Sequence, residues 1–108
     1  MRPMRTVLAL ALLSSAAYAE SLHVTTVRDW QPTDPAPVSR AFRVQVIEGT
    51  MGGSRYTAQQ LMSWGTSRVH VGEDYEVVKA DDRSLTVIVK DKKGRENKER
   101  LDVTGVQQ

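Results

Sequence analysis

The chain has 108 residues, with 15 lysines and arginines against 13 aspartates and glutamates, which gives a formal net charge of +2. A chain of this length forms one domain at most. It contains no cysteine, so a disulfide scaffold and a cysteine nucleophile are excluded.

Residues 1–19 have the three parts of a secretory signal peptide. Arg2 and Arg5 give a positive start, an apolar run covers 7–13, and Ala-Tyr-Ala at 17–19 is a small-x-small cleavage site. The apolar run is far shorter than the ~20 residues that cross a bilayer. We therefore expect a cleaved bacterial signal peptide, a periplasmic or secreted protein, and no membrane span after cleavage.

Cleavage changes the charge balance of the chain. Two of the basic residues leave with the signal peptide, so the segment 20–108 carries thirteen basic and thirteen acidic residues. The basic overall composition then partly reflects the targeting segment and does not indicate affinity for nucleic acid. We expect no nucleic-acid partner.

Residues 20–40 are predicted to form an extended, proline-rich arm before the folded domain. Leu22 and Val24 alternate with polar neighbours, which is typical of extended backbone. Three prolines follow within 32–37. Because proline removes a backbone donor and fixes φ, this stretch is predicted to be neither helix nor central strand.

A small β domain is predicted over 41–106. Phe42, Val44 and Val46 alternate with polar residues, which indicates a half-buried strand. The glycines that follow mark a bend. The next segment, 54–64, fits either the second strand of a hairpin or a short capped helix, and the hairpin signals favour the strand.

Short strands are predicted to continue towards the C-terminus, around 69–71, 75–79, 85–89 and 99–103, joined by polar turns. The segment 85–89 is apolar on both faces, which places it in the middle of a sheet or under a partner. Five to six short strands in so short a chain predict an all-β fold. We expect a small closed or partly open barrel, SH3-like or OB-like, with the strand order left open.

Catalytic chemistry has little support in the sequence. No serine stands in a Gly-x-Ser-x-Gly context. His23 lies near the new N-terminus, and His70 is expected on a strand facing solvent. His70 with Glu73 and Asp74 falls short of the three or four nitrogen or sulfur ligands that zinc sites usually use. We therefore expect no catalytic residue, no metal site, no cofactor and no enzymatic activity.

Aromatic and arginine residues give the stronger signal. Trp64 reads as a loop residue, Tyr56, Arg55 and Arg68 are expected near it once the barrel closes, and Trp30 is a second candidate anchor. Tryptophan, tyrosine and arginine are enriched at interaction hot spots. The competing interpretation is that one or both tryptophans plug the ends of the barrel.

The sequence thus favours an exported, non-catalytic binding protein, such as an accessory, inhibitor or immunity-type module. The expected partner is an envelope or secreted protein, or a cell-wall component. The alternative is a periplasmic carrier of a small ligand or metal that uses the barrel mouth or the region around His70. Oligomer formation is left open.

Overall fold

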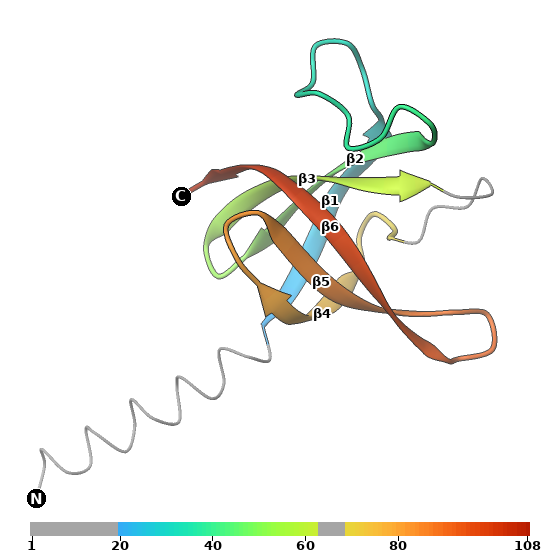
Figure 1. Cartoon of the computed structure of the whole chain (residues 1–108). Coiled ribbons are helices and arrows are strands. Elements are labelled where there is room, and N and C mark those ends of the chain that lie inside the picture. The colour runs from blue at the N-terminus through green and yellow to red at the C-terminus, as the bar shows by residue number, and fades with distance from the viewer. Residues whose placement is uncertain (1–19, 63–68) are drawn as a thin grey trace, which may run out of the picture.

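The computed structural model describes residues 20–62 and 69–108. The predicted signal peptide, Trp64 and Arg68 lie outside the described residues. Six antiparallel strands form one closed barrel (Figure 1). They are β1 (Ser21–Asp29), β2 (Arg43–Met51), β3 (Ser54–Met62), β4 (Asp74–Ala80), β5 (Ser84–Lys90) and β6 (Glu96–Gln107).

The barrel consists of two three-stranded meanders joined along both edges. Strands β1 to β3 are neighbours in chain order, as are β4 to β6, while β3 pairs with β6 and β1 pairs with β4. The prediction of a small closed all-β barrel is confirmed, and six strands are found where a five-stranded OB-like barrel was one alternative. Within the segment that fitted either strand or helix, the described residues Ser54–Met62 form a strand, β3.

Alternating side chains from all six strands fill the barrel interior. The least exposed include Leu22 on β1, Ile47 on β2, Leu85 and Val87 on β5, and Leu101 on β6, each 0–1% exposed. Strand β5 lies between β4 and β6, as its two-sided apolar pattern predicted. A domain this small depends on such complete burial because it has little interior volume.

The barrel begins earlier in the chain than the sequence predicted. The segment Ser21–Asp29, assigned to the arm before the domain, is β1 and pairs with both β2 and β4. A register shift between Val24 and Thr26 breaks its alternation, and a bulge of this kind hides a strand from pattern analysis. The arm is therefore reduced to the connection between β1 and β2, residues 30–42, which we call the proline loop.

The proline loop covers part of the outer face of the barrel. Val46 lies opposite Gln59 in the pairing of β2 with β3, on the face turned away from the core residues Ile47 and Ala58. Val44 and Val46 are nevertheless only 5% and 2% exposed. The alternating face predicted for β2 is thus buried, but beneath the loop and outside the barrel.

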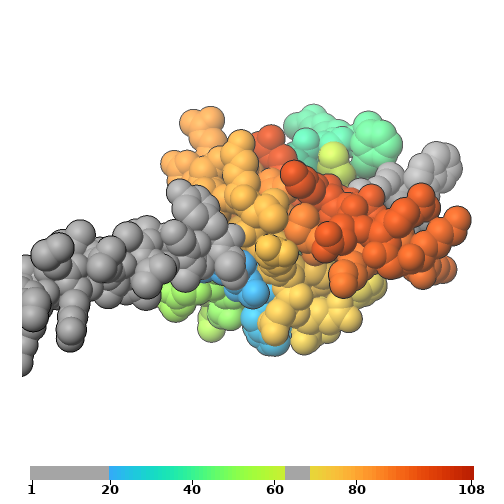
Figure 2. All heavy atoms as spheres, turned by 90° about the horizontal axis from the view of Figure 1, so that it is seen from below, coloured from blue at the N-terminus to red at the C-terminus, as the bar shows by residue number. Residues whose placement is uncertain are grey.

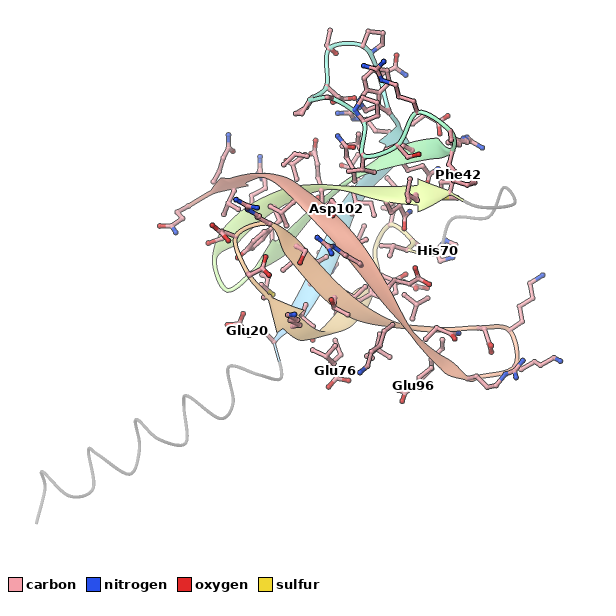
Figure 3. All side chains as sticks on the ribbon, in the orientation of Figure 1. Glu20, Phe42, His70, Glu76, Glu96 and Asp102 are labelled. Carbon is pink, nitrogen blue, oxygen red and sulfur yellow. The ribbon has the colours of Figure 1, made fainter. Side chains whose placement is uncertain are left out.

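Phe42 departs from its predicted position on that buried face. It precedes β2, at the end of the proline loop, and is 58% exposed. Figure 3 shows Phe42 at the end of the barrel where β3 stops. Pairing of β2 with β3 begins one residue later, at Arg43, so Phe42 has no strand neighbour among the described residues to cover its ring.

Candidate functional site

One buried side chain holds the proline loop against the barrel. Gln59, on β3, is 1% exposed. Its Oε1 accepts the Val38 N–H at 2.9 Å, and its Nε2 donates to the carbonyls of Pro35 and Ala36 at 3.2 and 3.3 Å. The Gln59 side-chain amide and the three backbone groups are thus hydrogen-bond partners of one another. Opening the loop would leave all four groups without these partners.

An ion pair fixes the first half of the loop. Both terminal nitrogens of Arg28, on β1, donate to the Asp34 carboxylate at 2.7 and 2.6 Å, and the Gln31 N–H donates to it at 2.8 Å. The Arg28 hydrogen bonds, followed by the Gln31 bond, lower the pKa of Asp34 to about 2. The carboxylate therefore stays charged through neutral and mildly acidic pH.

Trp30 joins the two ends of the loop. Its backbone N–H donates to Val44 O at 3.0 Å, and its indole Nε1–H donates to Pro35 O at 2.8 Å. The indole is half-buried. Compact surface loops whose ends lie close together and whose own side chains pack them are frequently functional.

A largely apolar groove opens between the loop and the start of β2. Its volume is about 670 Å³, and it is open to solvent. The volume lies within the range of sites that bind small molecules. The groove is lined by Asp29, Trp30, Pro37, Ser39, Arg40, Phe42, Arg43 and Val44.

Exposed aromatic, aliphatic and cationic groups surround this groove. Val38 is 40% exposed in addition to Phe42. Arg43 is neutralised by Asp29, whose carboxylate accepts from its Nη2 at 2.7 and 2.9 Å. Arg40 makes no hydrogen bond or ion pair with any described residue. We call the group Trp30, Pro37, Val38, Arg40, Phe42 and Arg43 the loop surface.

The predicted binding residues do not form one cluster in the described chain. Trp30 belongs to the loop surface. Tyr56 and Arg55 lie at the start of β3, at the β2–β3 hairpin and away from Trp30 (Figure 1); Tyr56 is half-buried against the core, and Arg55 is exposed. Trp64 and Arg68 fall outside the described residues, so their part in binding stays a prediction.

Two residues of the loop surface, and the Gln59 side chain that holds the loop, carry little signal in the sequence. Phe42 fits the alternation of a buried strand, and Arg40 and Gln59 look like ordinary polar positions. Only the tertiary fold brings Gln59 under the loop. The sequence feature that does indicate an ordered loop is the density of prolines after Trp30, because prolines restrict a loop to few conformations.

A second, polar groove lies beside β4. It has a volume of about 460 Å³ and is lined by His70, Glu73, Asp74, Tyr75, Glu76, Ile88, Val89, Lys90 and Glu96. Figure 3 shows Glu76 and Glu96 next to each other on this side of the barrel. This groove includes His70, the residue around which the sequence suggested a binding site for a small ligand or metal.

Tyr75 organises the chain at this second groove. Its hydroxyl accepts the His70 N–H at 2.7 Å and donates to Glu73 Oε2 at 2.8 Å. Burial is the main cause that raises the pKa of Tyr75 to about 12. The strand predicted at 69–71 is not formed: His70 is exposed in the turn before β4, where Gly72 takes a positive φ of 86°, and the His70 N–H is bonded to the Tyr75 hydroxyl and not to a strand.

Comparison with protein-family models, curated proteins and solved structures finds no match for this chain. Among residues 20–62 and 69–108, no group of three or more histidine, cysteine, aspartate or glutamate side chains is arranged to hold a metal ion. The same part of the chain contains no helix long and apolar enough to cross a membrane.

Proposed function

We propose that this chain is an exported, non-catalytic binding protein that recognises another protein, or a cell-envelope component, through the loop surface. The observation that supports the proposal most is the exposed Phe42 ring beside the Trp30 groove, on a loop that Gln59 holds in place. An exposed apolar patch such as this one is informative, whereas a single exposed apolar residue is not.

The loop is suited to recognition because it is already ordered. Aromatic and arginine side chains in central pockets supply most of the binding energy at protein interfaces. A loop fixed by Gln59 and by the Arg28–Asp34 pair loses less conformational entropy on binding than a free arm. Arg40, which has no partner among the described residues, is available to a carboxylate of the bound protein.

A carrier that holds its ligand inside the barrel has less support. Leu22, Val24, Leu85 and Val87 occupy the interior and are each 0–1% exposed. The predicted signal peptide directs the search for the partner to envelope and secreted proteins and to cell-wall material.

Affinity capture with matched variants tests the proposal. Tagged wild-type protein is used to capture partners from envelope and secreted fractions of the source cells, and the affinity for each captured partner is measured. Phe42→Ala and Arg40→Ala are expected to weaken that affinity by about 30-fold or more, the loss typical of a hot-spot residue.

Two control variants make the same kinds of change elsewhere. Val106→Ala truncates an exposed apolar side chain on β6, and Arg55→Ala removes an exposed arginine at the β2–β3 hairpin. Both are expected to retain wild-type affinity, and all four variants are expected to melt like the wild type. Equal loss in the controls, or wild-type affinity in Phe42→Ala, contradicts the assignment of the site.

A further inference from the structure

The β5–β6 hairpin continues beyond the barrel as a two-stranded ribbon. Strand β5 pairs with β4 only up to Val87, and β6 pairs with β3 only from Asp102 onward. Within the described chain, 88–90 and 96–98 therefore pair only with each other. Figure 1 shows the hairpin leading away from the barrel at the lower right, and Figure 2 shows its orange side chains at the edge of the molecule. We call residues 88–100 the charged ribbon.

The charged ribbon is basic although the folded chain as a whole is balanced. It contains six basic and three acidic residues, whereas the segment 20–108 has equal numbers of each. A local excess of positive charge on a projecting element attracts anions even when the net charge is near zero. All six basic side chains are exposed: Lys90, Lys92, Lys93, Arg95, Lys98 and Arg100.

The strand register gathers several of these cations on one face. Leu85, Val87 and Leu101 point into the core, so the residues that alternate with them point outward. Neighbouring strands lie about 4.8 Å apart, and outward residues on one strand repeat about every 6.7 Å. The cations on this outer face are Lys90 on β5, Lys98 and Arg100 on β6, and Lys79 on β4, which stands across from Thr86 of β5. The same face also carries two acidic side chains, Glu96 across from Lys90 and Asp102 across from Ser84.

Two of the six basic side chains of the ribbon, Arg95 and Arg100, form ion pairs. Asp91 is engaged in the hairpin turn, where it accepts the N–H groups of Lys93 and Arg95 and pairs with the Arg95 guanidinium at 3.4 Å. Asp102 pairs with Arg100 at 3.2 Å. In residues 20–62 and 69–108, no ion pair involves Lys90, Lys92, Lys93 or Lys98.

We propose that the charged ribbon is a docking surface for the anionic headgroups of a lipid bilayer. Its outer face and tip present several cations at once. Its base borders the groove beside β4, while its tip projects beyond the barrel and suits a flat anionic surface. The ribbon contains no aromatic side chain, so it lacks the stacking platforms that single-stranded nucleic acid requires. Each lysine or arginine near an anionic bilayer strengthens partitioning about 5-fold.

Vesicle sedimentation tests this docking surface. The purified protein, its N-terminus determined by mass spectrometry, is mixed with phosphatidylcholine vesicles with and without phosphatidylglycerol, at low and high salt. We expect binding that requires phosphatidylglycerol and is lost at high salt, because salt screens exposed charges. Equal binding to uncharged vesicles, or no binding to either, overturns the proposal.

Charge-matched variants locate the contact. The double variants Lys92→Gln/Lys93→Gln and Lys90→Gln/Lys98→Gln are each expected to lower the partition constant about 30-fold. Arg55→Gln/Arg83→Gln removes the same charge outside the ribbon, from exposed residues at the β2–β3 hairpin and in the β4–β5 turn. It is expected to leave partitioning within a few-fold of the wild type. Equal loss in all three double variants means a response to net charge alone and overturns the proposal.

Two further measurements distinguish a lipid bilayer from a soluble anionic polymer, and the ribbon from the loop surface. Heparin, a soluble anionic polymer, is tested by the same variants: retention on heparin without vesicle binding identifies a polymer and overturns the lipid assignment. Phe42→Ala is expected to bind vesicles like the wild type, because the loop surface and the ribbon are different parts of the barrel (Figure 1). Loss of vesicle binding in Phe42→Ala refutes a contact made by the ribbon.

Discussion

Replacing Gln59 by alanine tests whether the proline loop is part of the folded core. The change removes three hydrogen bonds to the backbone of Pro35, Ala36 and Val38, two of them longer than 3.1 Å. At about 1 kcal/mol net for a well-formed neutral hydrogen bond and less for long ones, the loss is roughly 2 kcal/mol. The space left by a side chain that is 1% exposed adds up to about 1 kcal/mol.

The expected destabilisation of Gln59→Ala is therefore about 2–3 kcal/mol. For a domain of this size each kcal/mol lowers Tm by about 4–8 °C, so calorimetry should record a fall on the order of 10–20 °C. Hydrogen exchange should also resolve where the loss occurs. The Val38 amide should lose protection at temperatures where amides of β5 remain protected, because the loop can open before the barrel does.

Gln31→Ala is the matched control for this change. Gln31 lies in the same loop and is exposed, and the contact that it makes with Asp34 uses its backbone N–H. The unfolding free energy of Gln31→Ala should differ from that of the wild type by no more than about 0.5 kcal/mol, as for ordinary surface substitutions. A wild-type Tm for Gln59→Ala, together with unchanged protection of the Val38 amide, would refute the claim that this side chain orders the loop.

Three further predictions concern pH and backbone packing. Asp34→Asn should lower stability at neutral pH; because the folded pKa of Asp34 is lowered to about 2, its contribution is present above about pH 4 and is lost as pH falls towards 2. Urea midpoints of variant and wild type should therefore converge below pH 4, and a constant gap down to pH 2 would contradict the role of Arg28. Burial raises the folded pKa of Tyr75 to about 12, so wild-type stability should fall between pH 10 and 12, and Tyr75→Phe should lack this fall; tyrosinate absorbance with no group titrating near 12 would argue against it. Gly49→Ala places a Cβ 2.7 Å from a backbone oxygen of β1 and should cost about 1–3 kcal/mol, whereas Gly105→Ala meets open space and should keep its Tm; equal melting temperatures would show that the approach at Gly49 is not tight.

The sequence predicts strands well where alternation is uninterrupted. Leu85 and Val87, flanked by polar turns, mark β5, which the structure places between β4 and β6. Prediction from alternation fails at β1, because the register shift after Val24 interrupts the pattern and prolines follow soon after. The strand order could not be predicted from the sequence either, since the pairing of β3 with β6 joins residues that are far apart in the chain.

Alternation also does not say which side of a closed sheet a face belongs to. Val44 and Val46 share a face as predicted, but that face is the outer one, and the loop buries it. Phe42 continues the same pattern into a region without a strand neighbour and is exposed instead. The part of the site that the sequence predicted, Trp30, is the part whose residue type alone suggests binding.

A domain this small and without cysteine needs stabilising contacts beyond its interior core. The proline loop supplies some of them, because it covers Val44 and Val46 on the outer face. Full burial of a valine is worth about 1.5–3 kcal/mol relative to leaving it exposed, so even part of this gain for two valines is comparable with a disulfide at about 2–4 kcal/mol. Variants that loosen the loop at Gln59 should therefore lose both stability and partner binding, whereas Phe42→Ala should lose binding alone. That difference separates the residue that holds the loop from the residue that the partner contacts.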